Sequence, residues 1–166
     1  MDQDRVDRII EQWQRERPDL DVSPLGAIGR LHRVGAQLER ELLPIFAEEG
    51  LGQGDFDVLA TLRRAGEPYE ATPSRIAATS MITSGAATKR IARLERAGLV
   101  TRRASESDGR VQVIGLTPEG RELMDRLVER HVANEHRLVG MLEPADREHL
   151  ARILRSWALA LGDGEG

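Results

Sequence analysis

The sequence predicts a mainly α-helical protein with one small β-hairpin. Apolar residues recur at helical spacing through most of the 166 residues. Proline, threonine and glycine interrupt these segments at positions typical of helix starts and ends. Two short segments, around residues 99–103 and 111–113, instead predict strands that are joined by a charged turn. We expect the remaining regular structure to be helical.

The N-terminal part of the chain predicts two helices. Residues 4–17 have an apolar face, and Pro18 ends this helix. Ser23 is followed by a proline, a combination that places an N-cap directly before the first helical residue. The second helix should extend over residues 24–49, with a kink at Pro44 because proline lacks the amide hydrogen that a helix interior uses.

Short and long helices flank the predicted hairpin. Helices are expected over residues 55–64, 73–79, 83/84–96, 118–142 and 144–161. Thr117 before a proline, and Glu143 before another, mark the starts of the last two. A short helix, a turn and a second helix followed by a hairpin form a winged helix-turn-helix, so we expect this arrangement in the middle of the chain.

Composition excludes several classes of protein. The chain has no cysteine, which excludes disulfides, thiolate metal sites and cysteine nucleophiles. No segment resembles a secretory signal or approaches the roughly 18 apolar residues of a membrane span, so we expect a cytoplasmic protein with no membrane partner. It contains no nucleophile–base pair, HExxH motif, phosphate loop or dinucleotide fingerprint, so we expect that it is not an enzyme.

The distribution of charge favours a nucleic-acid partner. The chain as a whole carries a net charge of −4. Residues 72–110 contain eight basic and three acidic residues, a local charge of +5, and the remainder therefore carries −9. A basic region on an otherwise acidic body is typical of a protein that binds a polyanion at one surface.

The second helix of the predicted helix-turn-helix carries the side chains that a recognition helix needs. Hydroxyl groups lie near its start and cations follow one turn later, an order that suits base edges and phosphates. Small residues keep this helix slim enough for a major groove about 12 Å wide. At the hairpin tip an arginine can reach the minor groove, and an aspartate beside it fixes this arginine or the tight turn. The predicted DNA-binding residues are Thr83, Ser84, Gly85, Thr88, Lys89, Arg93, Asp108 and Arg110.

These residues belong to a longer pattern that resembles the MarR family of transcriptional regulators. The matching segments are Thr83-Ser84-Gly85-Ala86, Arg90-Ile91-x-Arg93-Leu94-Glu95-x-Ala97-Gly98-Leu99-Val100, Asp108-Gly109-Arg110 and Leu116-Thr117-x-x-Gly120. The resemblance covers about residues 23–161. It implies a homodimer that presents one recognition helix per subunit to a palindromic operator in double-stranded DNA. It also implies a repressor that needs no cofactor and is released by a small molecule.

The resemblance divides the chain into three parts. Residues 1–53 are expected to hold an extra N-terminal helix and a dimerisation helix. Residues 54–117 are expected to form the winged helix-turn-helix DNA-binding domain. Residues 118–166 then contribute C-terminal helices to the dimer.

The extra N-terminal helix resembles the urate-responsive, PecS/HucR-like branch of the family. In that branch the effector site is formed by a tryptophan on the added helix, an aspartate on the next short helix, an arginine on the recognition helix and an arginine at the start of the wing. The matching residues are Trp13, Asp57, Arg90 and Arg102, with Arg103 as an alternative to Arg102. Urate is a planar anion, which suits guanidinium groups, an indole wall and a carboxylate that accepts ring N–H groups.

A mechanism for the response follows as a hypothesis. The anion enters near Arg102 and competes with Asp57 for its cationic partners. The displaced Asp57 then pulls on Arg90 and moves the recognition helices of the dimer out of register with the DNA.

Other interpretations of these residues stay open at this point. Trp13 can be a packing anchor, Asp57 a charge favoured by the helix dipole, and each arginine a phosphate contact. Citrate or aconitate, which are effectors of TamR-like relatives, and phenolic ligands are alternatives to urate. An architectural DNA-binding protein without an effector is a further alternative. A metal site is disfavoured, because His131 and Glu135 share a helix face that we expect to be solvated while His136 points elsewhere.

Overall fold

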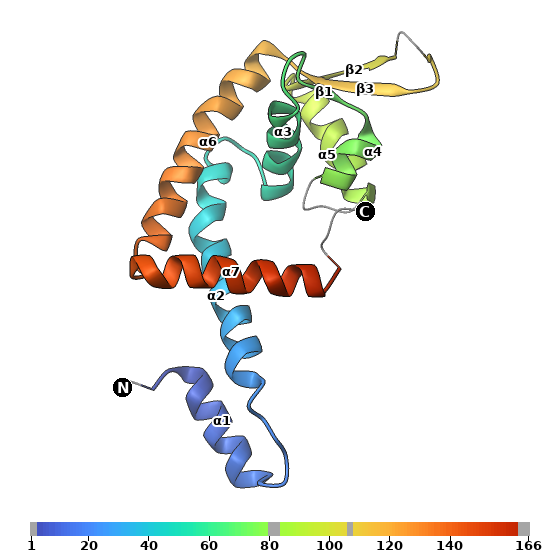
Figure 1. The fold of residues 1–166 in the computed structure, drawn as a ribbon. Coiled ribbons are helices and arrows are strands. Elements are labelled where there is room, and N and C mark those ends of the chain that lie inside the picture. The colour runs from blue at the N-terminus through green and yellow to red at the C-terminus, as the bar shows by residue number, and fades with distance from the viewer. Residues whose placement is uncertain (1–2, 80–83, 106–107, 163–166) are drawn as a thin grey trace. The chain divides into compact units, whose positions relative to one another are not determined.

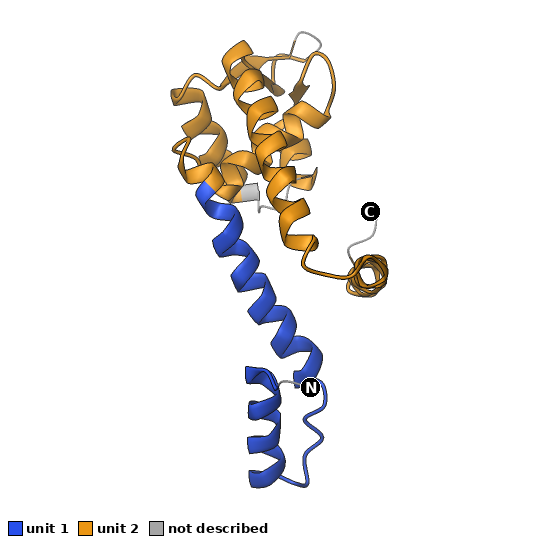
Figure 2. Ribbon diagram, turned by 90° about the vertical axis from the view of Figure 1, so that its left-hand side faces the viewer, with its two compact units in different colours: residues 1–44 blue, residues 45–166 orange. Residues whose placement is uncertain are grey.

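A computed structural model describes residues 3–79, 84–105 and 108–162 of the chain (Figure 1). The chain divides into two compact units, residues 1–44 and 45–166 (Figure 2). The elements are α1 (Arg5–Glu16), α2 (Leu25–Ala47), α3 (Gln53–Arg64), β1 (Glu70–Ala71), α4 (Pro73–Thr79), α5 (Ser84–Arg96), β2 (Val100–Ala104), β3 (Gln112–Leu116), α6 (Pro118–Val139) and α7 (Pro144–Ala160). This order confirms the expected mainly α-helical fold.

In the first unit, charged groups fix the start of helix α1. Asp4 caps it by accepting hydrogen bonds from the amides of Val6 at 2.7 Å and Asp7 at 2.9 Å. Arg30 of α2 donates to the same carboxylate at 2.8 Å. The amide of Asp7 and the guanidinium of Arg30 lower the pKa of Asp4 to about 2. Val6 is buried beside Gly29, where an added Cβ would lie 3.4 Å from it.

Helix α3 provides the centre of the core in the second unit. Val58, Leu59 and Leu62 are completely buried between α5 and α6. The neighbouring helices and strand β3 add further buried apolar side chains, namely Ile76, Ile91, Leu94, Ile114, Met124 and Leu127. Burying an aliphatic side chain contributes about 1.5–3 kcal/mol to stability, so this cluster accounts for the compactness of the second unit.

The predicted hairpin is present as β2 and β3, and the structure adds a third strand to it. The antiparallel sheet has the order β1-β3-β2. Strand β1 pairs Glu70 with Gly115 and Ala71 with Ile114. Because β1 consists of two residues, it shows no alternation of apolar and polar side chains by which the sequence could have indicated it.

Two glycines join the sheet to the helices around it. Gly98 has a φ of 72°, a left-handed conformation that ends α5, and the amide of Leu99 closes the turn by donating to the carbonyl of Leu94 at 3.0 Å. At Gly120, in the first turn of α6, a Cβ would lie 2.0 Å from the carbonyl oxygen of Leu99. Only glycine therefore allows α6 to begin so close to the start of β2.

Helices α6 and α7 begin at the predicted residues, α2 begins one residue after the predicted Pro24, and all three end slightly before the predicted residues. Thr117 caps α6 by accepting a hydrogen bond from the amide of Gly120 at 2.9 Å. Helix α2 ends at Ala47, with Pro44 inside it, and α6 ends at Val139. Helix α7 has no buried residue. Within the described residues, no helix is both long and apolar enough to cross a membrane.

Candidate nucleic-acid interface

Helix α5 presents an apolar face to the core and a polar face to solvent. Ala87, Ile91 and Leu94 are buried at the spacing of one helix face. Thr88 and Lys89 are exposed on the other face. At Gly85, also exposed, a Cβ would meet nothing within 4 Å, so the start of the helix is slim and open.

Two of the predicted DNA-binding residues are only partly covered by the structure. Thr83 lies outside the described residues. Ser84 is the first residue of α5, and its side chain also lies outside the description. Their proposed contacts with base edges rest on the sequence pattern.

The tip of the wing is a tight turn that an aspartate stabilises. Asp108 Oδ1 accepts a hydrogen bond from the amide of Arg110 at 3.0 Å, and the carbonyl of Asp108 accepts one from the amide of Val111 at 2.9 Å. The aspartate therefore holds the turn through backbone groups. The side chain of Arg110 is exposed at this tip.

Strand β2 separates two neighbouring arginines. Adjacent residues of a strand point to opposite faces of its sheet. Accordingly Arg102 pairs with Glu95 of α5, with Nε 3.2 Å from Oε2, while Arg103 pairs with Glu70 of β1 at 2.8 Å. Of the two candidates for the effector site, Arg102 is thus the one that faces α5.

A buried carboxylate of α3 faces two arginines of α5. Asp55 is 0% exposed, and its Oδ2 lies 2.8 Å from Arg93 Nη1. Its Oδ1 lies 3.7 Å from Arg90 Nη1. The sequence interpretation missed this residue, because an acidic residue at the third position of a helix is common for reasons of capping and dipole alone.

Asp57 lies on the opposite side of α3 from Asp55, because residues two apart on a helix differ by about 200°. Burial raises the pKa of Asp57, and the charges of Arg64 and His131 oppose that rise. The hypothesis linked Asp57 to Arg90. The structure instead pairs Arg90 with Asp55.

The four predicted effector residues are distributed over both units. Trp13 lies on α1 in the first unit, where its side chain is 47% exposed. Asp57, Arg90 and Arg102 lie in the second unit, on α3, α5 and β2. Within the second unit, α5 carries both Arg90 and Glu95, the partner of Arg102.

His131 is part of an aromatic cluster, not the solvated surface that its spacing predicted. Its side chain is only 16% exposed. Its ring centroid lies 4.8 Å from that of Phe56 and 5.4 Å from that of Phe46. Nε2 lies 3.3 Å from a carboxylate oxygen of Glu135. Among the residues that the structure describes, no group of three or more side chains could hold a metal ion.

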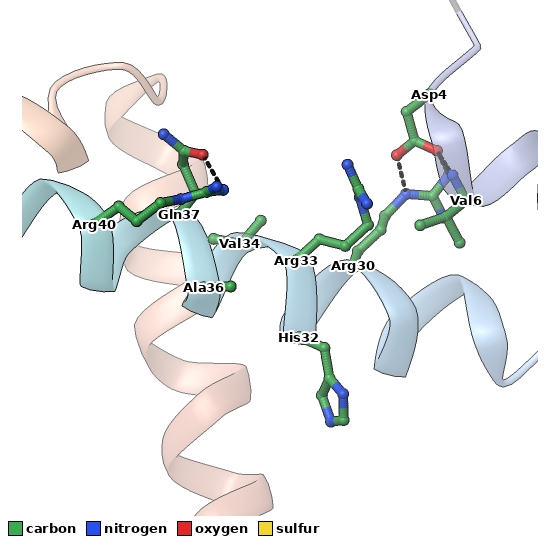
Figure 3. A pocket seen from close by; sticks show the side chains of 9 residues that line it. All are labelled: Asp4, Val6, Arg30, His32, Arg33, Val34, Ala36, Gln37 and Arg40. Carbon is green, nitrogen blue, oxygen red and sulfur yellow. Dashed lines mark hydrogen bonds and ion pairs between the residues drawn. The ribbon is translucent and has the colours of Figure 1, made fainter.

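The first unit contains a hollow of about 490 Å³ along α2 (Figure 3). Arg30 and Arg33 extend to one side of the helix there, and His32 points away from them (Figure 3). Arg40 donates a hydrogen bond to Gln37 Oε1 at 2.7 Å. The sequence pattern did not indicate this hollow, because its cations belong to separate turns of one long helix.

Comparisons with known proteins agree with this geometry. A model of the MarR family matches residues 49–111, which include α3 to β2 and the turn that follows β2. Over 149 residues, the chain is 43% identical to the HTH-type transcriptional regulator PecS of Dickeya dadantii, and the match covers 90% of each protein. The chain belongs to the MarR family of transcriptional regulators. This membership confirms the expected DNA-binding regulator and the expectation that the protein is not an enzyme.

Solved structures of other MarR regulators have the same fold. AbsC of Streptomyces coelicolor has a TM-score of 0.78 and 28% identity, over 87% of this chain and 98% of AbsC. Sco3205 of the same organism, whose structure is a complex with DNA, has a TM-score of 0.77 and 25% identity, over 86% of this chain and 93% of Sco3205. These matches confirm the winged helix-turn-helix fold of this MarR-family regulator.

Proposed function

We propose that this MarR-family protein is a repressor that binds a palindromic operator as a homodimer and is released by urate. One observation carries the proposal. Helix α5 bears exposed Lys89 on the face available to DNA, and Arg90 on the face that turns toward the carboxylate of Asp55. An anion that binds Arg90 therefore acts directly on the helix that reads the operator.

The homodimer is supported by the apolar surface of α7. Leu150, Ile153 and Leu154 are 44%, 52% and 38% exposed in the single chain. A contiguous apolar face of this kind marks a protein–protein interface. A symmetric dimer would bury it and present two recognition helices to the two halves of a palindrome.

The effector site is proposed to contain Trp13, Asp57, Arg90 and Arg102, the residues that match the urate-responsive branch. Arginine forks suit the negative charge and carbonyl edges of urate. Both arginines already have carboxylate neighbours, Glu95 beside Arg102 and Asp55 beside Arg90. Urate would compete with these carboxylates, so we revise the hypothesis: urate draws Arg90 away from Asp55 and so moves α5, and Asp57 binds the ligand.

The proposed DNA contacts follow the recognition helix and the wing. Hydroxyl groups and Lys89 at the start of α5 approach base edges and phosphates, and Arg110 of the wing enters the minor groove. Asp108 holds the wing turn in the shape that presents Arg110. The residues proposed to act at the DNA surface are Thr83, Ser84, Gly85, Thr88, Lys89, Asp108 and Arg110.

The test is fluorescence anisotropy of the full-length protein on labelled DNA from upstream of its own gene, at fixed salt concentration. Urate, citrate and salicylate are titrated separately into the formed complex. Release by urate alone supports the proposal, and release by citrate or salicylate alone replaces the ligand. If none of the three releases DNA that is tightly bound, the effector proposal is wrong and the DNA-binding regulator remains.

Two neighbouring arginines supply a matched pair of variants for the effector site. Arg102→Gln should raise the urate concentration needed for half-maximal release about tenfold or more, the effect of losing one charged hydrogen bond. Arg103→Gln removes the same charge from the other face of β2 and should leave that concentration nearly unchanged. Equal effects of both changes would exclude a specific role for Arg102.

The remaining two site residues are tested in the same assay. Trp13→Phe should weaken the response to urate without changing the affinity for DNA, because it removes the indole N–H donor and retains an aromatic wall. Asp57→Asn should also weaken the response. If it keeps both DNA binding and the full response, Asp57 has no part in the site.

A further inference from the structure

A single buried carboxylate faces two cations of the recognition helix. Asp55 Oδ2 accepts two hydrogen bonds, one from the amide of Gly52 at 2.8 Å and one from Arg93. Its Oδ1 accepts no hydrogen bond from the part of the chain that the structure describes, and its nearest cation is Arg90. A fully buried carboxylate is stable only when cations or hydrogen-bond donors compensate its charge, and these two arginines supply the compensation.

The two arginines contact Asp55 through their guanidinium groups, while other parts of their side chains remain at the surface. Arg90 and Arg93 are three residues apart on α5 and therefore share one face. Their side chains are 39% and 46% exposed. Arg93 Nη2 also donates a hydrogen bond to the carbonyl of Gly50, in the turn before α3. Arg93 thus ties the recognition helix to this turn as well as to Asp55.

This arrangement divides the cations of α5 into two groups. The helix carries Lys89, Arg90, Arg93 and Arg96. Two of these face Asp55, and Arg96 donates to the carbonyl of Ala92 within its own helix. Lys89, one turn before Arg93, is exposed to solvent. A guanidinium that left Asp55 for a DNA phosphate would exchange one anion for another and leave a buried charge uncompensated.

We propose that Asp55 is a specificity-determining positioning residue, which holds Arg90 and Arg93 against α3 and withholds them from DNA phosphates. Affinity for DNA of any sequence comes mainly from the neutralisation of phosphates. Withholding two cations lowers that affinity and leaves a larger share of binding to the contacts with base edges. Arg93, which the sequence pattern assigned to DNA, then acts as a tether of the recognition helix. The proposal depends on DNA binding alone and not on any effector.

The first test compares the wild-type protein with Asp55→Asn on two DNA duplexes, the upstream region of its own gene and a scrambled duplex of the same length. The amide oxygen of asparagine can still accept the bond from Gly52, but the negative charge is lost. Kd is measured for both duplexes over a series of salt concentrations, without effector. We expect Asp55→Asn to bind scrambled DNA about tenfold more tightly, with a salt slope steeper by about 1 to 2, because each new phosphate contact adds about 0.9.

A matched control separates this effect from a change in overall charge. Glu122→Gln raises the net charge of the protein equally, from an exposed position on α6. It should leave the salt slope and the ratio of the two Kd values close to wild type. If Asp55→Asn weakens binding to both duplexes equally with an unchanged salt slope, Asp55 only supports folding and the proposal is overturned.

A second pair of variants tests the proposal even if Asp55→Asn does not fold. Lys89→Gln should reduce the salt slope by about 0.9, the value for one lost phosphate contact. Arg90→Gln, which breaks an ion pair without a hydrogen bond and leaves Arg93 on Asp55, should not change the slope. If Arg90→Gln reduces the slope as much as Lys89→Gln does, Arg90 contacts phosphate and the proposal is wrong. Far-UV circular dichroism confirms that each variant is folded.

The outcome for Asp55 can be distinguished from a failure of the proposed release by urate. All of these measurements use protein and DNA without urate or any other effector. A protein that fails to respond to urate can still show the expected salt slopes. Conversely, a normal urate response with an unchanged slope for Asp55→Asn overturns only the role proposed for Asp55.

Discussion

Helices α3 and α7 have comparable apolar side chains but opposite surroundings. Helix α3 has 12 residues, of which Val58, Leu59 and Leu62 are completely buried. Helix α7 has 17 residues and buries none of them, although Ile153 and Leu154 lie on one face. The difference shows which apolar faces the single chain satisfies by itself. The face of α3 is used in the core of the single chain, and that of α7 is exposed to solvent in it.

The same contrast separates two kinds of stability. Around α3, side chains from α5, α6 and β3 pack together, so the second unit has its own hydrophobic core. Apolar residues of α7 remain in contact with water unless a second surface covers them. We therefore expect changes in α3 to act on folding, and changes in α7 to act on assembly.

The largest effect is expected from a cavity in α3. Leu62→Ala removes a completely buried side chain and should lower the free energy of unfolding by about 3 kcal/mol. Leu150→Ala on α7 is the matched change at a position that is 44% exposed. Urea denaturation at several protein concentrations measures both. The loss for Leu62→Ala should be the same at every concentration, whereas the loss for Leu150→Ala should shrink on dilution; equal, constant losses would contradict the comparison.

A charge on the apolar face of α7 should act on assembly. Ile153→Glu should weaken the dimer at least about 100-fold, because a carboxylate would be buried at the interface without a partner. Ala151→Glu places the same charge about 200° around the helix, at another exposed position, and should leave the dimer intact. Light scattering coupled to size-exclusion chromatography gives the mass of each variant. If Ile153→Glu keeps the wild-type mass, this face of α7 is not the interface.

These helices also show how far sequence periodicity leads. Apolar spacing, a capping threonine and prolines at helix starts predicted α6 and α7, and the structure confirms them within a few residues. Periodicity identifies an apolar face, but it does not distinguish a face that packs within the chain from one that packs on a partner. His131 illustrates this limit, because its position on α6 predicted a solvated side chain and the structure packs it against Phe46 and Phe56.

The candidate site was less predictable than the fold, because its residues meet across long stretches of chain. Asp55 contacts Arg93, which is 38 positions later, and no local pattern links the two. The order of Arg102 and Arg103 likewise could not identify the one that faces α5, since that depends on the register of β2 with β3. The sequence can indicate which types of residue a site for an anion needs. Which of these residues pair with each other depends on how α3 packs on α5.

A smaller effect is expected from the ionisation of Asp57, which lies on α3. Burial raises the pKa of Asp57 above its ordinary value, so the folded protein binds a proton there more readily than the unfolded chain does. Protonated Asp57 therefore contributes stability at pH values below its pKa in the unfolded chain. This contribution is lost as the pH rises through its higher pKa in the folded protein. Asp57→Asn should therefore stabilise the protein at pH 7 relative to wild type, and this advantage should disappear in acid. Urea denaturation at pH 7 and near pH 3.5 checks both; an advantage that persists in acid would show that charge is not its cause.

The smallest effect is expected at the start of α1, where charged groups add to the packing of buried Val6. The pKa of Asp4 is lowered to about 2 by the amide of Asp7 and by Arg30, so its contribution is present above the ordinary value of 3.8 and is lost as pH falls through about 2. The chain has two tryptophans, and Trp157→Phe leaves Trp13 of α1 as the only one. In that background the emission of Trp13 should shift as pH falls from 4 to 2. Asp4→Asn keeps a capping side chain but removes the charge that pairs with Arg30, so its shift between these pH values should be weaker. An identical shift in both proteins would show that another carboxylate causes the transition. The ion pair between Asp4 and Arg30 would then not be what fixes the start of α1.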